Sequence, residues 1–287
     1  MQKLEVFGAN KLRGQIKISG SKNASLPILA ASLLSSKITY LKNLPKVMDI
    51  QTMLSLLESL GSKIKVKKDR TIIDNTKQKK KFASYNLVKT MRAGILVLGP
   101  LLAKFGSAKV SLPGGCAIGT RPVDLHLKAL SKLGVRYEIK QGYVIASAPR
   151  GLKGNNIRFS KISVGATENL IIASSFAKGI TTLSNCAIEP EIKDLIIFLK
   201  KLGSIINLKG RTITIKESKR KSSKILHEVI FDRIELGTYM IACSLLAKKN
   251  MIIDKIDPKI VKNEINVLRS IGVKIIKNKS SITIKKK

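Results

Sequence analysis

A repeat of about 70 residues is the feature that most constrains how this chain folds. Four helical patterns each end at a glycine, and these glycines stand 73, 69 and 69 residues apart: Gly61, Gly134, Gly203 and Gly272. Glycine adopts the left-handed conformation that commonly ends a helix. Apolar and basic residues then alternate, which predicts a half-buried strand after each glycine, at 63–67, 135–139, 205–209 and 273–277. We therefore expect four copies of one supersecondary unit.

A second shared feature lies upstream in each copy. An Ala- and Leu-rich helix is followed by a short strand and then by a proline, which is Pro45, Pro113, Pro190 or Pro258. Each copy thus has the order β-α-β-α-β-β, and alternating helices and strands predict an α/β fold. The alternative is two unrelated α/β domains whose helix ends look alike by chance. Two matched features at matched spacing argue against that alternative.

The charge of the chain invites a nucleic-acid interpretation, but the charge pattern does not favour one. Lys and Arg number 54 against 18 Asp and Glu, a net charge of +36. The basic residues are spread along the whole chain, aromatic residues make up only 4%, and no helix-turn-helix, zinc-finger or RNP pattern is present. We interpret the lysines mainly as a solvated surface whose field attracts anionic small molecules.

Metal, disulfide and membrane chemistry are all disfavoured. Three cysteines and two histidines form no metal-ligand or disulfide pattern. The longest nearly apolar run, 93–103, has 11 residues, well short of the ~20 that span a bilayer. No secretory signal pattern opens the chain. We expect a cytoplasmic protein with no cofactor, no metal and no membrane partner.

Three helix starts carry cations. Ser19–Asn23 precedes an apolar helix and contains Lys22, 89–93 contains Lys89 and Arg92 and opens a helix that runs into Pro100, and 161–169 is a strand-to-helix junction with Lys161. Backbone N–H groups and the helix dipole favour an anion at such a start. Each segment alone is also compatible with an ordinary capped helix and solvated charges. Because they recur in consecutive repeats, we predict a common pocket for a polyanion.

The loop before the second helix of the second repeat carries the strongest chemical signal. Leu112–His126 holds three glycines in six residues, with Cys116 among them and Arg121 nearby; Pro122 predicts the first turn of the next helix. A neighbouring cation stabilises a thiolate and lowers the thiol pKa, so Cys116 can act as a proton donor or nucleophile. Cys186 and Cys243 stand in apolar segments and are interpreted as buried structural residues.

These segments resemble the enolpyruvyl transferases. The resemblance rests on Gly20–Ala24, Lys89–Ala93, Leu112–His126, Ser163–Glu168 and Asp232–Glu235, and it covers essentially all 287 residues. The Cys116 loop is typical of the members that act on UDP-N-acetylglucosamine. The resemblance implies two inside-out α/β barrels built from βαβαββ repeats. It implies a complete first domain at 21–232, with 1–20 and 233–287 forming an incomplete second domain of about one repeat.

The resemblance also implies a reaction and a site. The enolpyruvyl group of phosphoenolpyruvate would pass to the 3′-hydroxyl of UDP-N-acetylglucosamine through a tetrahedral ketal, with release of phosphate, as the first committed step of peptidoglycan synthesis. Cys116 would be the catalytic acid, and Lys22 and Asn23 would bind phosphoenolpyruvate. The sugar nucleotide would contact Arg92, Arg121, Pro122, Val123, Asp124, Leu125, Lys161, Ser163, Val164 and Gly165. No nucleic-acid partner is implied, and the oligomeric state is left open.

The chain departs from the family in length, since the family has six repeats and four are present here. No segment matches the family's remaining aspartate or its further phosphoenolpyruvate-binding arginines. We therefore expect the chain acting alone to show severely reduced or no turnover, and apolar side chains and strand edges between Ile234 and Ile284 to be exposed. The alternative function is a non-catalytic remnant that binds UDP-sugar.

Overall fold

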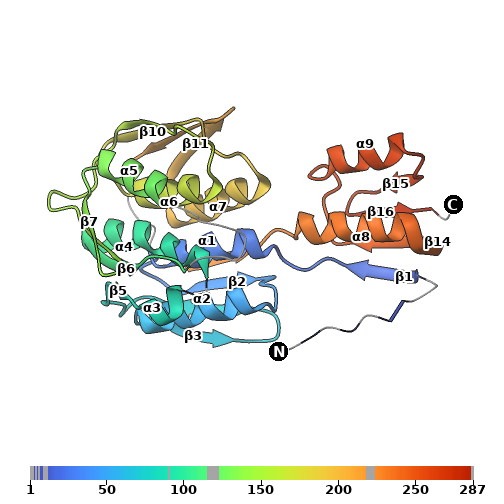
Figure 1. The fold of residues 1–287 in the computed structure, drawn as a ribbon, viewed down its shortest axis with the longest axis horizontal. Helices are drawn as coiled ribbons and strands as arrows, with labels where there is room; N and C mark the ends of the chain where they lie inside the picture. Colours follow the sequence, from blue (N-terminus) through green and yellow to red (C-terminus); the bar gives the residue numbers. More distant parts are fainter. Residues whose placement is uncertain are drawn as a thin grey trace. The chain divides into compact units, whose positions relative to one another are not determined.

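The computed structural model describes residues 3, 5, 7, 8, 12–89, 91–114, 123–217 and 224–285. The chain divides into two compact units (Figure 1). One unit comprises Met1–Ser21 and Phe231–Lys287, and the other comprises Lys22–Ile230. We call them the small unit and the large unit and describe each by itself.

The large unit holds three four-stranded sheets of the same topology. In each sheet the first two strands of the hydrogen-bonded order are parallel, and every later pair of neighbours is antiparallel. The orders are β13-β2-β4-β3, β5-β6-β8-β7 and β9-β10-β12-β11. The strands are β2 (Thr39–Lys42), β3 (Lys63–Val66), β4 (Thr71–Asp74), β5 (Phe82–Ala83), β6 (Ser107–Ser111), β7 (Arg136–Lys140), β8 (Tyr143–Ser147), β9 (Asn156–Arg158), β10 (Ile180–Ser184), β11 (Ile205–Lys209), β12 (Thr212–Lys216) and β13 (Ile225–Glu228).

Helices connect the strands of each sheet in the βαβαββ order that the sequence predicts. They are α1 (Lys22–Ser32), α2 (Met48–Ser59), α3 (Tyr85–Val88), the 3₁₀ helix η1 (Arg92–Val97), α4 (Leu98–Phe105), α5 (Asp124–Lys132), α6 (Val164–Ser174) and α7 (Pro190–Leu202). The glycines that end the helical patterns have positive φ, for example 101° at Gly61 and 110° at Gly203. The repeat and the α/β class are therefore confirmed.

The small unit contains a fourth sheet of the same design, in the order β1-β14-β16-β15. Its elements are β1 (Leu12–Lys17), α8 (Arg233–Leu246), β14 (Ala247–Asp254), α9 (Lys262–Ser270), β15 (Ile275–Lys277) and β16 (Ser281–Ile284). The parallel pair of this sheet joins distant segments, since Leu12 pairs with Ala247. The first sheet of the large unit is completed in the same way by β13, in which Ile225 pairs with Thr39.

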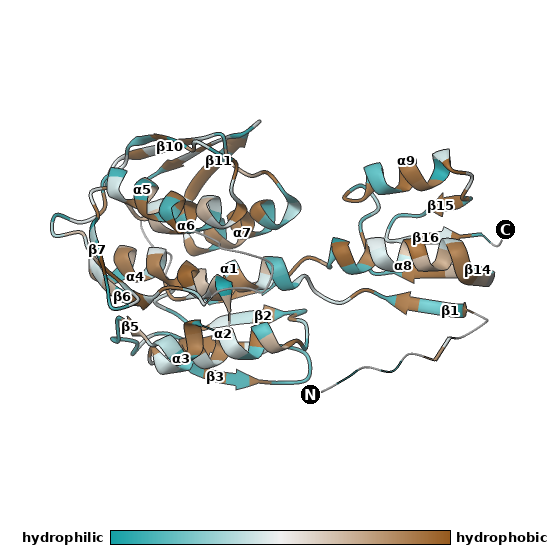
Figure 2. Cartoon of the chain, viewed as in Figure 1, coloured by the Kyte–Doolittle hydropathy of each residue, from teal (hydrophilic) through white to brown (hydrophobic). Residues whose placement is uncertain are grey.

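The core of the large unit is built around three central helical segments: α1, η1 with α4, and α6. Helices α4 and α6 contact each other, and η1 contacts both α1 and α6. Nearly every residue beyond the first turn of each segment is buried, for example Leu29, Leu98 and Leu170. Such a helix needs apolar residues on all sides, as the brown segments of Figure 2 show.

Two details of helix placement correct the sequence analysis. The segment after Lys89 is 3₁₀ helix from Arg92 to Val97 and becomes α-helix only from Leu98 to Phe105, whereas the sequence predicted one regular helix running into Pro100. Pro100 lies in the first turn of α4, where a missing N–H breaks no helical hydrogen bond. Helix α5 begins at Asp124, so the predicted start at Pro122 was two residues too early.

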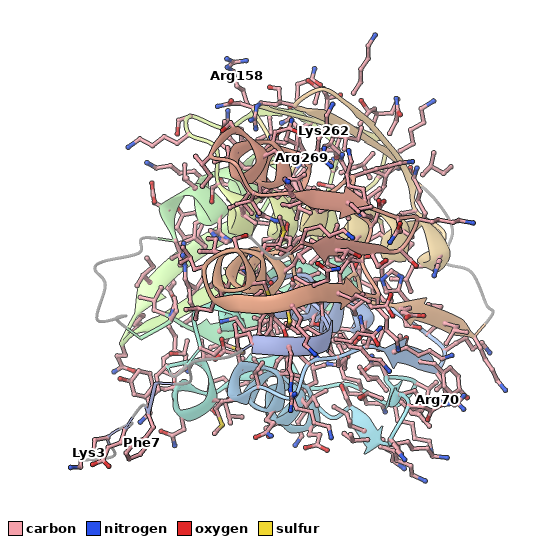
Figure 3. The ribbon with its side chains drawn as sticks, turned by 90° about the vertical axis from the view of Figure 1, so that its right-hand side faces the viewer. Lys3, Phe7, Arg70, Arg158, Lys262 and Arg269 are labelled. Carbon is pink, nitrogen blue, oxygen red and sulfur yellow. The ribbon has the colours of Figure 1, made fainter. Side chains whose placement is uncertain are left out.

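The surface of each unit bears out two further expectations. Exposed apolar side chains gather in the small unit, including Leu245 (76% exposed), Ile271 (68%) and Val267 (62%). Cationic side chains such as Arg70, Arg158 and Lys262 are exposed, and those of Arg70 and Arg158 lie at the margin of the view in Figure 3. No helix among the described residues is long and apolar enough to cross a membrane.

Candidate functional site

Lys22 and Asn23 lie at the start of α1. Lys22 is the first residue of the helix, and its Nζ lies 2.9 Å from Asp49 Oδ2 on α2. Asn23 is exposed. The first turn of α1 contains no acidic residue, so the positive end of the helix dipole is not offset there by the helix's own side chains. This arrangement suits an anionic group near Lys22.

Arg92 lies at the start of η1 and is exposed. Its charge acts on two neighbours, His126 of α5 and Glu168 of α6. The helix-start cation of the second repeat is therefore close to residues of both α5 and α6. Gly114, the last described residue before Cys116, lies close to the chain that precedes η1, because a Cβ at Gly114 would come within 3.3 Å of Lys89 Cα.

The start of α6 is a capped helix N-terminus. Ser163 is the N-cap, and its Oγ accepts a hydrogen bond from the Ala166 N–H at 3.3 Å. Thr167 Oγ1 donates to the Ser163 carbonyl at 2.7 Å and accepts from the Ala187 N–H at 3.1 Å. Val164 is exposed and Gly165 is half-buried, and Lys161, two residues before the cap, is exposed. The backbone of this start is therefore held firmly while its surface is open to solvent.

The start of α5 lies against the start of α6. Val123, Asp124 and Leu125 are half-buried, and Asp124 Oδ2 pairs with Lys128 Nζ at 3.4 Å. The next residue, His126, is buried, and its ring approaches Gly165 so closely that a Cβ there would lie 3.3 Å from Cε1 and 3.5 Å from Nε2. Because residue 165 is glycine, the start of α6 can pack closely against the His126 ring of α5.

His126 is uncharged at neutral pH. Burial lowers its pKa to about 4, with a further lowering by Arg92 and an opposing effect of Asp124. The ring is buried beside Asn169, whose Nδ2 lies 3.1 Å from His126 Nδ1.

Glu168 is a buried acid that the sequence analysis did not assign to the site. Burial raises its pKa well above the ordinary value, nearby Glu191 and Glu189 raise it further, and Arg92 opposes the rise. Glu189 Oε2 is itself buried with no hydrogen-bond partner among the described residues. An acidic and an amide residue in an otherwise apolar helix were the signal in the sequence that could have revealed Glu168 and Asn169.

The structure thus brings together part of the predicted site. Arg92, the start of α5 and the start of α6 form one cluster, and α1, which begins at Lys22, contacts both η1 and α6. Cys116, Arg121 and Pro122 lie outside the described residues. Cys186 and Cys243 are free and buried, and burial raises the pKa of both thiols, that of Cys186 to about 12. Their interpretation as structural residues is confirmed.

Known proteins resemble the chain over almost its whole length. A family model described as EPSP synthase (3-phosphoshikimate 1-carboxyvinyltransferase) matches residues 6–287. A Pelagibacter ubique protein named UDP-N-acetylglucosamine 1-carboxyvinyltransferase is 64% identical over 284 residues, 99% of this chain and 68% of the relative. An Aliarcobacter butzleri protein of the same name is 45% identical over 291 residues, with the same shares covered.

Solved structures agree on the fold. The enolpyruvyl transferase NikO from Streptomyces tendae matches with a TM-score of 0.84 at 20% identity, over 97% of this chain and 66% of that one. An EPSP synthase from Acinetobacter baumannii matches with a TM-score of 0.76 at 13% identity, over 97% and 65%. The chain therefore spans about two thirds of the length of the proteins it matches.

Proposed function

The chain belongs to the EPSP synthase family of enolpyruvyl transferases, and from this premise we propose that it transfers the enolpyruvyl group of phosphoenolpyruvate to the 3′-hydroxyl of UDP-N-acetylglucosamine. The observation that carries the proposal is the 64% identity, across 99% of the chain, to a relative named for that reaction. Cytoplasmic peptidoglycan synthesis is part of the same proposal.

Each half of the proposed site suits one polyanionic substrate. Lys22 and Asn23 would bind phosphoenolpyruvate at the start of α1, where an ammonium and a helix dipole both attract phosphate. The sugar nucleotide would be held by Arg92 of η1, by 121–125 at the start of α5, and by Lys161 and 163–165 at the start of α6. Guanidinium and backbone N–H donors are suitable partners for a diphosphate.

Cys116 would act as the proton donor of the reaction. Protonation of the methylene carbon of phosphoenolpyruvate leaves cationic character on the adjacent carbon, which the 3′-oxygen attacks as the hydroxyl loses its proton. The resulting tetrahedral ketal then loses phosphate and returns a proton from the methyl group, so the enol ether is restored. A positioned acid of suitable pKa lowers the barrier to the first step. Arg121 is the residue proposed to keep the thiol pKa low.

Two measurements on the 287-residue chain test the proposal. We expect isothermal titration calorimetry to show binding of UDP-N-acetylglucosamine, weakened about tenfold or more in Arg92→Ala, as for loss of one charged hydrogen bond. We expect phosphate release by this chain to be severely reduced, and what release there is to require both substrates and to be abolished in Cys116→Ala but not in Cys243→Ala. The proposal would be overturned if the unmutated 287-residue chain bound neither substrate and released no phosphate. Binding without release would favour the alternative of a UDP-sugar-binding remnant.

A further inference from the structure

We propose that Asn169 is a positioning residue of the sugar-nucleotide site: its side-chain amide holds His126 as a neutral ring protonated on Nε2 and fixes the start of η1 and α4 against the starts of α5 and α6. The identity of the ligand rests on the proposed function. The hydrogen-bond geometry does not depend on that function.

The orientation of the Asn169 amide follows from its backbone partners. The Gly99 N–H donates to Asn169 Oδ1 at 2.9 Å, and Asn169 Nδ2 donates to the Ile95 carbonyl at 3.2 Å. A backbone N–H needs an acceptor and a carbonyl needs a donor, so exchanging the amide oxygen and nitrogen would break both bonds. Asn169 is fully buried, so its amide makes these contacts away from bulk solvent.

This orientation determines the protonation of His126. Asn169 Nδ2 lies 3.1 Å from His126 Nδ1, and an amide nitrogen can only donate. His126 Nδ1 therefore accepts and carries no proton, which places the ring proton on Nε2. The low pKa of His126, caused first by burial, agrees with a neutral ring.

The same amide secures the backbone that presents Arg92. Ile95 and Gly99 flank the change from 3₁₀ to α geometry between η1 and α4. The Ile95 carbonyl accepts the Leu98 N–H as well, so the Asn169 amide is its second donor. Arg92 lies three residues before Ile95. A Cβ at Gly99 would overlap Asn169 Oδ1, so the close approach of the two segments depends on glycine at position 99.

The far end of the imidazole reaches the start of α6. Cε1 and Nε2 face the Gly165 position, and His126 follows Asp124 by two residues. One amide and one ring thus connect Arg92, the start of α5 and Gly165, all of which are proposed to hold the sugar nucleotide. The charged groups that act on the ring are Arg92 from η1 and Asp124 from α5, with Glu168 beside Asn169 on α6.

A functional consequence follows from the neutral ring. If His126 gained a proton near neutral pH, both nitrogens would become donors, the Asn169 contact would be lost and Arg92 would face a second positive charge. Burial and Arg92 disfavour this protonation, and the Asn169 Nδ2 donor at His126 Nδ1 opposes it at that nitrogen, so ligand affinity should not depend on His126 titration between about pH 5.5 and 8. In Asn169→Asp an acceptor replaces the donor, and the ring should then take up a proton at Nδ1.

The experiment measures the ring and the ligand separately. We expect the histidine nitrogen shifts of the parent to show the Nε2–H tautomer of His126 with no titration above about pH 5.5; His126→Gln assigns the signal against His227. In Asn169→Asp we expect the His126 pKa to rise by at least about one unit. The dissociation constant for UDP-N-acetylglucosamine should rise about tenfold and become pH-dependent. Asn207→Asp, an exposed site on β11 with the same charge change, should alter neither.

The outcomes separate this inference from the proposed function. A proton on His126 Nδ1 in the parent would overturn the inference, and that spectrum needs no variant to fold. Unchanged ring titration and unchanged affinity in a folded Asn169→Asp would also overturn it, as would a variant that is less stable but shows the parental pH profile. Failure of the parent to bind UDP-N-acetylglucosamine would defeat the proposed function, whereas the tautomer result would stand.

Discussion

Lys22 Nζ and Asp49 Oδ2 lie 2.9 Å apart and join the start of α1 to the first turn of α2. The side chains are 43% and 36% exposed, so the pair contributes little to folding stability. Its effect is on charge, because the ammonium proposed to meet the phosphate of phosphoenolpyruvate already faces a carboxylate. A phosphate arriving at Lys22 must compete with Asp49 or approach beside it.

Asp49→Asn should therefore strengthen phosphoenolpyruvate binding. Removing one negative charge within a few ångströms of the anion is worth about 1 kcal/mol in a solvated site, or about fivefold in affinity. Isothermal titration calorimetry at low ionic strength measures the change. Asp69→Asn is the matched control, because Asp69 pairs with Arg70 on an exposed turn. An equal gain in both variants would show a general field effect and contradict the role of the Lys22–Asp49 pair.

The stability of the large unit should fall in acid because of His126. Its pKa is about 4 in the folded protein against 6.5 as a reference value. Between these values the unfolded state binds more protons, so stability rises with pH there and is lost as pH falls from about 6.5 to 4, by up to about 3 kcal/mol. Urea unfolding at pH 7 and pH 4.5 measures this loss. His126→Gln should show a flatter profile, and an unchanged profile would exclude His126 as the cause.

Glu168 should produce the opposite pH dependence. Its pKa is raised in the folded protein, mainly by burial, so the folded state keeps a proton that the unfolded state releases above about pH 4.5. Stability contributed by the neutral acid is consequently lost as pH rises. Glu168→Gln should be more stabilising, or less destabilising, at pH 8 than at pH 5 in urea unfolding. Glu138→Gln, an exposed change on β7, should show no such difference between the two pH values.

Gly99→Ala should destabilise the large unit by about 2 kcal/mol, as expected for overpacking. The new Cβ overlaps Asn169 Oδ1 and lies 2.7 Å from the Asn169 carbonyl oxygen, in a fully buried contact. Gly237→Ala on α8 is the control, since a Cβ there meets nothing within 4 Å and removing a helical glycine is neutral or stabilises by up to about 1 kcal/mol. Each change is read from the urea transition of its own unit. A Gly99→Ala protein as stable as the parent would show that α4 and α6 can separate at no cost.

Local sequence pattern was sufficient for the repeat and for the α/β class. Gly61 and Gly203 ended helices as predicted because only glycine enters positive φ without strain. Alternating residues marked the strands that follow, because side chains in a strand point to opposite faces in turn. The buried cysteines were also identifiable, since both stand in apolar segments. These features depend on neighbours within a few residues, which a linear sequence displays directly.

Partners distant in the chain were decided only by the tertiary structure. Alternation marks a strand but does not name its neighbour, so the pairing of Leu12 with Ala247 could not be read from local periodicity. Asn169 meets His126, Ile95 and Gly99 across 43 to 74 residues of chain. An amide in an apolar helix signals only that a partner must exist, because buried polar groups are costly when unpaired. Which groups satisfy it, and hence that His126 stays neutral beside Arg92, depends on how the central helices close around one another.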